Sequence, residues 1–285
     1  MLIAQVTDIH LGFDRGNPHE LNVRRLNIVI DQLNALTPRP DLLIVSGDLV
    51  EHGDDAHAYD HVHALLGRWE GPMLLCVGNH DGRAAFAAEF PQVRRTSDGF
   101  IQYVSEQEGL RIIVLDTLDE GRHGGTFCEA RAAWLAERLA EAPARPTLLV
   151  LHHPPLDTGI PWMSALPHEG WVERLRAVVE PAHHVVGMIC GHVHRAITAT
   201  FAGRHLVVAP STAPQVALDL KHVDPQHPDG RALIIADPPA FALHHWDGER
   251  LLTHFEIAGP RNVLASYSHN LQPMMREFLR ERGTG

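Results

Sequence analysis

Seven side chains of this chain have the types and positions of metal ligands. Each follows a short run of Val, Ile and Leu residues, and together they are Asp8, His10, Asp48, Asn79, His152, His192 and His194. A set of carboxylate, amide and imidazole groups without a thiolate favours Mn, Fe, Zn, Co or Ni over copper(I) or a structural zinc. The set exceeds what one tetrahedral ion accepts. It therefore predicts two divalent ions about 3.5–4 Å apart.

The spacing of these residues suggests how the ions are shared. Asp8 with His10, and His192 with His194, are two positions apart, so in an extended chain each pair faces one side and can hold one ion. Asp48 stands alone after Gly47 and is expected to bridge the two ions. After the carboxylates and a hydroxide are counted, such a site keeps about one positive charge, which suits an anionic phosphoryl group.

The residues next to Asn79 supply proton chemistry. We expect His80 to give a proton to the leaving-group oxygen, and Asp81 to set the tautomer of His80 and raise its pKa. Asn79, His80 and His153 are expected to face the substrate, with His153 supporting the ligands while its neighbour His152 binds the ion.

Alternating strands and helices are predicted to position these groups. Apolar runs without alternation are typical of strands buried on both faces, and segments with helical period lie between several of them. The strands are 2–6, 42–45, 73–77, 112–115, 148–151 and 185–190, and the helices are 19–36, 54–69 and 129–139. This order predicts an α/β layered fold with the ligands at the carboxyl ends of the strands. Five later strands, at 197–201, 206–209, 232–236, 241–245 and 251–257, are expected to form an antiparallel meander, and 273–282 a helix.

Composition limits the function classes. The 285 residues include 24 basic and 35 acidic side chains, for a formal charge of -11, which argues against a nucleic acid polymer as partner. Cys76, Cys128 and Cys190 are too far apart for a disulfide framework or a thiolate zinc site. No apolar stretch reaches the roughly 18 residues of a membrane span, and no signal peptide begins the chain. We therefore expect a cytoplasmic, reduced protein with no membrane partner.

Other residues leave alternatives open. His57 and His61 lie one helical turn apart and are expected on a solvated face, although that spacing can hold a metal. His123 stands in a glycine-rich loop, where it is either exposed or reaches the substrate. Trp162 and Met163 either wall the pocket or pack elsewhere.

Five motifs in order, D-x-H, GD, GNHD, HHPP and GHVH, cover Asp8 to His194. They resemble the calcineurin-like metallophosphoesterase superfamily, and within it the bacterial branch of class III cyclic nucleotide phosphodiesterases and glycerophosphodiesterases. The resemblance implies a four-layer α/β/β/α sandwich with mixed sheets and a dinuclear centre. By family position, one ion takes Asp8, His10, Asp48 and His194, and the other takes Asp48, Asn79, His152 and His192.

The function implied is a dinuclear-metal-dependent phosphodiesterase in which hydroxide held by the metals attacks a small cyclic nucleotide or glycerophosphodiester. The alternatives are a phosphomonoesterase or phosphotriester hydrolase using the same site, a nuclease, and a non-catalytic scaffold, which would be expected to have lost ligands. One departure concerns the leaving group. Related glycerophosphodiesterases place a His after the strand that follows GHxH, whereas here the stretch 210–215 has none.

We expect a single domain over 1–285, in which the part from about 210 onward varies within the family. That part completes the sheet, forms a lid, or makes a contact in a homodimer or higher homo-oligomer. An apolar stripe at helical spacing near the end either packs on its own domain or forms a subunit interface; its residues are Leu271, Met274, Met275, Phe278 and Leu279.

Overall fold

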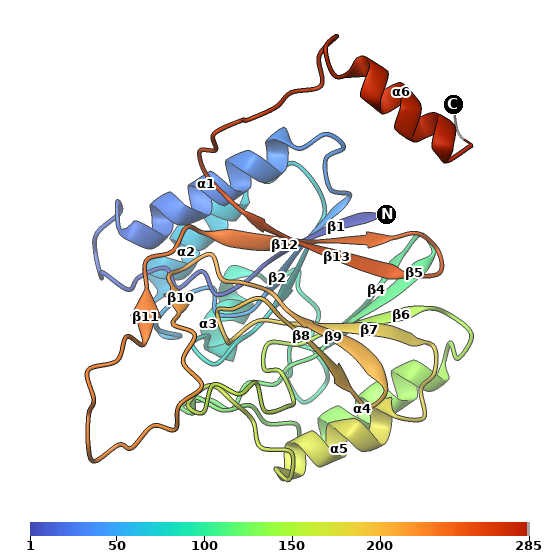
Figure 1. The fold of residues 1–285 in the computed structure, drawn as a ribbon. Helices are drawn as coiled ribbons and strands as arrows, with labels where there is room; N and C mark the ends of the chain where they lie inside the picture. The colour runs from blue at the N-terminus through green and yellow to red at the C-terminus, as the bar shows by residue number, and fades with distance from the viewer. Residues whose placement is uncertain (284–285) are drawn as a thin grey trace.

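The computed structural model describes residues 1–283 and shows two β-sheets stacked between two layers of helices (Figure 1). In the first sheet β1, β2 and β3 run parallel, and a hairpin of β12 and β13 pairs antiparallel to β1. Its spatial order is β13 (Leu251–Ile257), β12 (Ala240–Trp246), β1 (Leu2–Val6), β2 (Leu42–Ser46) and β3 (Met73–Cys76).

The second sheet has a parallel centre of β5, β6, β7 and β9, with β4 and β8 antiparallel at its two edges. Its order is β4 (Tyr103–Gln107), β5 (Leu110–Val114), β6 (Thr147–Val150), β7 (Val185–Cys190), β9 (Arg204–Val208) and β8 (Ile197–Phe201). A small separate ribbon joins β10 (Gln215–Val216) to β11 (Ile234–Ile235). Both larger sheets are therefore mixed, as the resemblance implied.

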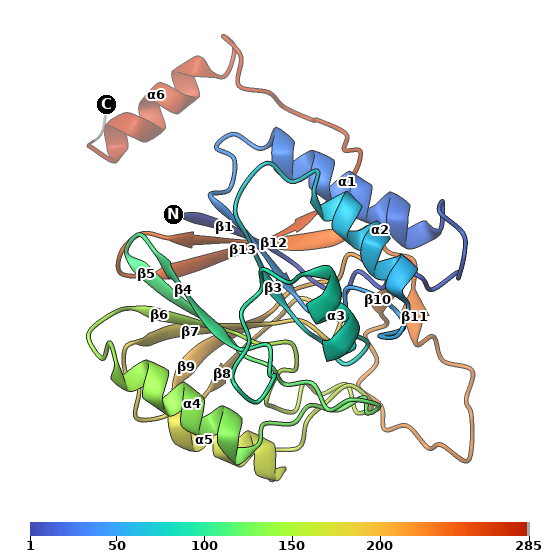
Figure 2. The same ribbon diagram turned by 180° about the vertical axis from the view of Figure 1, so that it is seen from behind.

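Helices form the outer layers. α1 (Leu21–Ala35) and α2 (Ala56–Leu66) lie on the first sheet, and α3 (Arg83–Glu89) lies beside α2; α4 (Glu129–Ala140) and α5 (Gly170–Val179) lie on the second sheet (Figure 2). The four-layer α/β/β/α prediction is thereby confirmed. α6 (Gln272–Glu281) stands away from these layers at the end of an extended segment.

Apolar side chains on both faces of the central strands hold the layers together. Along β5, Ile112 and Val114 belong to the cluster that includes the first sheet, α1 and α2, whereas Ile113 belongs to the cluster under α4 and α5. Alternate residues of a strand point to opposite faces, so β5 contributes to both cores. This explains why the sequence of such strands shows no polar alternation.

The C-terminal strands correct one prediction. They do not form one antiparallel meander, because β9 joins the second sheet parallel to β7, whereas β12 and β13 cross to the first sheet. The side of β1 opposite β2 would otherwise expose unpaired backbone groups, and β12 covers it. The sequence analysis also did not predict β4, α3 and α5, because these elements are short and carry polar residues among the apolar ones.

Candidate metal centre

The seven predicted ligands converge between the carboxyl ends of the two sheets. Loops after β1, β2 and β3 bring Asp8, His10, Asp48 and Asn79, and loops after β6 and β7 bring His152, His192 and His194. Parallel strands place their carboxyl ends at one edge of a sheet. Neither sheet alone completes the cluster, so the packing of the two sheets builds it.

Four of these side chains form a first group around Asp8. The Nε2 atom of His194 lies 3.3 Å from Asp8 Oδ1 and 3.1 Å from His10 Nε2. His10 Nε2 in turn lies 3.6 Å from Asp48 Oδ2. The Nδ1 atoms of His10 and His194 donate to oxygen acceptors, so both Nε2 atoms of the neutral rings carry lone pairs, and two such atoms suit a cation between them.

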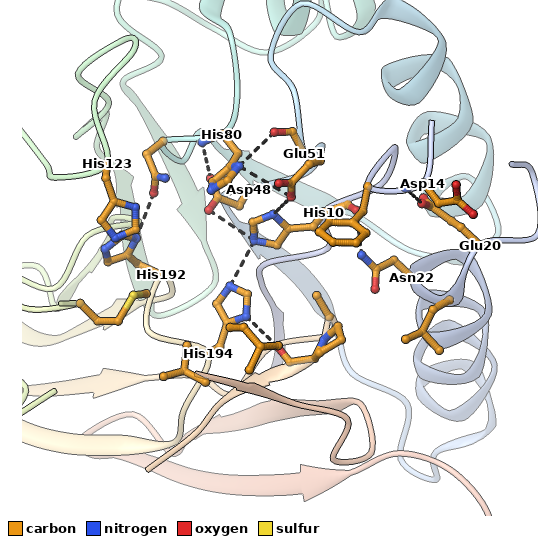
Figure 3. Close-up of a pocket in the computed structure, with 18 of the residues that line it drawn as sticks. His10, Asp14, Glu20, Asn22, Asp48, Glu51, His80, His123, His192 and His194 are labelled. Carbon is orange, nitrogen blue, oxygen red and sulfur yellow. Dashed lines mark hydrogen bonds and ion pairs between the residues drawn. The ribbon is translucent and has the colours of Figure 1, made fainter. Parts of the chain in front are cut away.

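A second group shares Asp48. The same Asp48 Oδ2 lies 3.2 Å from His152 Nε2. The Oδ1 atom of Asn79 lies 3.2 Å from His152 Nε2 and 2.9 Å from His192 Nδ1. Asp48 therefore contacts both groups, as the sequence predicts for a bridging carboxylate; Figure 3 shows it beside His10.

The opposite ring nitrogens of three histidines are held by oxygen acceptors. The Nδ1 atom of His152 donates to the Ser46 carbonyl at 2.9 Å, and that of His194 donates to the Pro214 carbonyl at 2.8 Å. In His10 the partner is a carboxylate, Glu51 Oε2, at 2.8 Å. Each contact places the proton on Nδ1 and leaves a lone pair on Nε2, which faces the cluster.

The backbone at the cluster is strained in a way that aims these side chains. Among the described residues other than glycine, φ is positive at Asp8, His10, Asp48, His192 and His194, with values of 52–73°, and elsewhere only at Ala202. The left-handed region costs energy for residues with a Cβ and persists where the surrounding structure enforces it. Its concentration at five of the seven predicted ligands marks the site.

Two glycines allow the ligands to approach. A Cβ at Gly78 would collide with the Asp48 carboxylate, and a Cβ at Gly191 would collide with the Thr7 side chain and lie 2.9 Å from Asp8 Oδ2. Gly78 precedes Asn79, and Gly191 precedes His192. The motifs therefore need glycine because the Cβ position is occupied by the ligand Asp48 at Gly78, and by Thr7, next to the ligand Asp8, at Gly191.

The electrostatics of the cluster favour a cation. Burial alone would lower the pKa of His152, but the carboxylates of Asp48 and Asp8 raise it to about 9. Burial would also raise the pKa of Asp48, but His152, His10 and His80 hold it well below its usual range. Positive charge is thus favoured strongly between these carboxylates, and divalent ions would supply it. The donor set and its orientation fit two such ions.

His80 stands at the open side of the cluster, and its contacts correct the role given to Asp81. The His80 Nδ1 atom donates to the main-chain carbonyl of Glu51 at 3.0 Å. The Asp81 carboxylate points the other way and accepts from Gly78 N at 2.8 Å and Tyr59 Oη at 3.1 Å. Asp81 therefore shapes the loop and does not set the His80 tautomer, because its side chain turns into the core.

His153 is the second correction. Its side chain is buried, does not line the cavity beside the cluster, and has its Nδ1 atom 2.8 Å from Thr117 Oγ1. Its ring centroid lies 4.6 Å from that of His192. His153 thus packs behind the predicted ligand His192, outside the described wall of the cavity.

A cavity of about 470 Å³ opens beside the cluster. His123 and His192 lie at one side of it, and Asp14, Glu20 and Asn22 lie at the other (Figure 3). Apolar residues complete the wall of the cavity. Among them are Trp162 and Met163, whose place the sequence analysis left open. The others include Phe13, Leu21, Val216 and Ile234. His57 and His61 are outside this cavity, on α2.

Glu51 is a residue in contact with the predicted site histidines that sequence reasoning missed. It lines the cavity and contacts His10 with its carboxylate and His80 with its carbonyl. The signal that could have identified Glu51 is a charged residue three positions after Asp48, in the loop that follows β2. The carbonyls of Ser46 and Pro214 had no signal, since any residue carries one.

Comparisons with known proteins agree with this architecture. The model of the calcineurin-like phosphoesterase family matches residues 1–196. The chain belongs to this family, whose members use a dinuclear centre of divalent ions, and the clustered Asp and His residues described above can bind such ions.

Individual relatives span most of the chain. A probable cyclic nucleotide phosphodiesterase of Rhodopseudomonas palustris is 37% identical and aligns with 91% of this chain and 94% of its own length. A probable glycerophosphodiester phosphodiesterase of Arcobacter nitrofigilis is 31% identical and aligns with 91% of this chain and 94% of its own length. A 3',5'-cyclic adenosine monophosphate phosphodiesterase of Escherichia coli is 33% identical over 75% of this chain and 76% of its own.

Solved structures share the fold at lower identity. A dimetal phosphatase from Danio rerio superposes with a TM-score of 0.61 at 16% identity, covering 89% of this chain and 98% of its own. A purple acid phosphatase from yellow lupin has a TM-score of 0.62 at 13% identity, covering 93% of this chain and 57% of its own. In addition, no helix within residues 1–283 is long and apolar enough to cross a membrane.

Proposed function

We propose that this protein is a dinuclear-metal-dependent phosphodiesterase that hydrolyses small phosphodiesters. The observation that carries the proposal is the pair of ligand groups sharing Asp48 at the floor of the cavity. We assign Asp8, His10, Asp48 and His194 to the first ion, and Asp48, Asn79, His152 and His192 to the second.

Two divalent ions in this site supply positive charge for the phosphoryl oxygens and bring the ionisation of water close to neutral pH. The chain's own part is to orient these groups and to exclude water with the apolar wall. His80 in its charged form carries a proton on Nε2 for the leaving-group oxygen, while its Nδ1 atom donates to the Glu51 carbonyl and so orients the ring.

The cavity favours a diester over a monoester. Among the described residues that line it, none is Lys or Arg, whereas Asp14, Glu20 and Glu51 are acidic. A monoester dianion carries one more negative charge than a diester and would need a further cationic partner. The lining therefore supports a monoanionic substrate.

The apolar wall narrows the substrate class further. Phe13 and Trp162 offer aromatic surface, and Ala213 and Pro214 occupy the stretch where related glycerophosphodiesterases have a His. A flat ring next to the phosphoryl group would bury more apolar area here than a glycerol would. Among the two substrate classes named for the relatives, we therefore propose a cyclic nucleotide before a glycerophosphodiester.

Initial rates on bis(p-nitrophenyl) phosphate and p-nitrophenyl phosphate, side by side in excess Mn²⁺, test the proposal. We expect a clear preference for the diester, followed by turnover of a cyclic nucleotide. A preference for the monoester would overturn the diesterase assignment and favour a phosphatase using the same ions. Comparison with Zn²⁺, Co²⁺ and Fe²⁺ would select the metal pair.

The assignment of Asp48 has its own test. Asp48→Ala should lose nearly all turnover while its circular dichroism spectrum stays that of the parent protein, since both ion positions lose a ligand. Full activity in this variant would contradict the dinuclear centre.

A further inference from the structure

Glu51 is the only carboxylate among the oxygen acceptors that hold the outer nitrogens of His10, His152 and His194. The other two acceptors are the uncharged main-chain carbonyls of Ser46 and Pro214. A hydrogen bond to an ionised acceptor is stronger than one to a neutral acceptor. A carboxylate behind a metal-binding imidazole also makes the imidazole a better ligand. His10 thus has a support that the other two rings lack.

The contact is built into the backbone. Glu51 N donates to the Leu11 carbonyl at 2.8 Å, and His10 N donates to the Asp48 carbonyl at 3.1 Å. The loop after β1 and the loop after β2 are therefore tied together on both sides of the His10–Glu51 contact. The Glu51 side chain is 19% exposed, so it faces the cavity without being freely solvated.

The same carboxylate also lies near His80. The Oε2 atom that accepts from His10 is 3.7 Å from His80 Nδ1, and the two rings meet edge to face with centroids 4.6 Å apart. The His80 ring, however, is hydrogen-bonded to the Glu51 carbonyl, which a change of the Glu51 side chain leaves in place. A change of the Glu51 side chain therefore removes the hydrogen bond of His10 but leaves the one that holds His80.

We infer that Glu51 is a positioning residue for the first ion: its carboxylate orients His10 and strengthens it as a ligand, without itself binding the ion or the substrate. This inference rests on the ligand assignment of the proposed function and extends it to the residue behind the ligand. It does not depend on which phosphoester is cleaved.

Mn²⁺ binding to the metal-depleted protein, followed by electron paramagnetic resonance of the free ion, is the direct test. The Asn79→Ala variant lacks a ligand of the second ion only, so it isolates the first. In that background we expect Glu51→Ala to raise the dissociation constant about 10–100-fold. Glu51→Gln keeps an acceptor oxygen without its charge. Its dissociation constant should lie between that of Asn79→Ala alone and that of Asn79→Ala with Glu51→Ala.

Glu89→Ala is the matched control, since Glu89 Oε1 makes the same kind of contact with His63 Nδ1, at 2.5 Å, between α3 and α2. It should leave Mn²⁺ affinity unchanged. An unchanged dissociation constant in Glu51→Ala, or an equal loss in Glu89→Ala, would overturn the inference.

A second readout separates positioning from general damage. At saturating Mn²⁺, Glu51→Ala should keep the parent's ratio of rates for p-nitrophenyl and alkyl diesters, because the carbonyl still holds His80. A changed ratio would mean that the side chain acts through His80 and would contradict the assignment to the first ion. If the parent cleaves no diester, the proposed function fails, whereas the Mn²⁺ titration still decides the role of Glu51.

Discussion

At the scale of single residues, the site is defined by which atom of each side chain is left free. Imidazoles of His10, His152 and His194 turn Nε2 to the cluster because Nδ1 is occupied by an oxygen acceptor. His80 also has Nδ1 on a carbonyl and Nε2 at the cavity, but its expected role as a proton donor requires the charged ring, with a proton on both nitrogens. What differs is that His80 faces the place where a leaving group would be.

His80→Ala is therefore expected to act on the leaving group. The loss should reach about 10²–10⁴-fold for alkyl diesters, whose alkoxides need a proton. It should be much smaller for p-nitrophenyl esters, whose leaving group departs as a stable anion. Steady-state kcat for both substrate types measures the difference, and equal losses would remove the acid role. Mn²⁺ affinity serves as the control, because His80 is not assigned as a ligand.

A second histidine links pH to stability. His244 is fully buried on β12, with Nε2 3.0 Å from Gln5 Oε1 and Nδ1 2.8 Å from Thr253 Oγ1. Burial, with a smaller effect of His205, lowers the pKa of His244 to about 3. Because the folded-state pKa lies below the unfolded value, the neutral ring stabilises the fold above about pH 6.5, and this contribution is lost as pH falls toward 3.

By linkage, the His244 contribution amounts to roughly 2 kcal/mol of unfolding free energy lost between pH 7 and pH 5. The His244→Gln variant should show a correspondingly shallower fall over this interval in urea unfolding, whatever its stability at pH 7. His245→Gln, at the exposed neighbouring position, should keep the parent's slope. Parallel curves for His244→Gln and the parent would contradict the prediction.

At the scale of elements, the sequence predicts where the ligands lie better than what each neighbouring side chain does. Buried parallel strands deliver their next residues to one edge, so Asp8, Asp48 and His192 could be placed together without a structure. Asp81 and His153 are adjacent to predicted ligands, but adjacency in a loop does not fix side-chain direction. Both turn inward, where Tyr59 and Thr117 meet them.

The strand pairing of the C-terminal part escaped prediction for a different reason. Whether β12 pairs with β9 or with β1 depends on contacts between distant parts of the chain, and a single strand carries no record of its partner. Ala242 pairs with Gln5 across more than two hundred residues. Amphipathic period finds such a strand but cannot assign it to a sheet.

A buried ion-pair cluster connects elements of the two halves of the molecule. Asp116 is fully buried after β5 and accepts two hydrogen bonds from Arg83 of α3, both at 2.8 Å. Arg131 of α4 lies 3.6 Å from the same carboxylate. One side chain therefore fixes α3, α4 and the loop that begins at Thr117.

Asp116→Ala should cost about 3–5 kcal/mol of unfolding free energy, because it leaves buried Arg131 without its carboxylate. Urea unfolding at neutral pH measures this cost. Asp119→Ala removes an exposed carboxylate from the same loop and should change stability by less than about 1 kcal/mol. Similar values for the two variants would show that the cluster does not hold the halves together.

At the scale of the whole molecule, the part beyond residue 210 divides into two. Strands β12 and β13 complete the first sheet, and Ala213, Val216 and Ile234 line the cavity. Within residues 235–283, by contrast, no side chain lines the cavity. We propose that the chain forms one domain, with any cover of the site provided before residue 235 and not by the C-terminal helix.

We therefore expect the final segment to have no role in the site. None of the residues of α6 is buried, so its apolar stripe does not pack into the core of its own domain. A chain ending at Asn262 should keep its Tm within about 2 °C, and its kcat/KM on a diester should equal that of the full chain, because no described residue after 262 belongs to either sheet or lines the cavity. Differential scanning calorimetry and steady-state kinetics measure both, and a large drop in kcat/KM at unchanged Tm would show that the segment acts as a lid. Light scattering of the full and shortened chains tests whether the segment makes a subunit contact. Such a contact would appear as a smaller oligomer for the shortened chain, with activity per site retained.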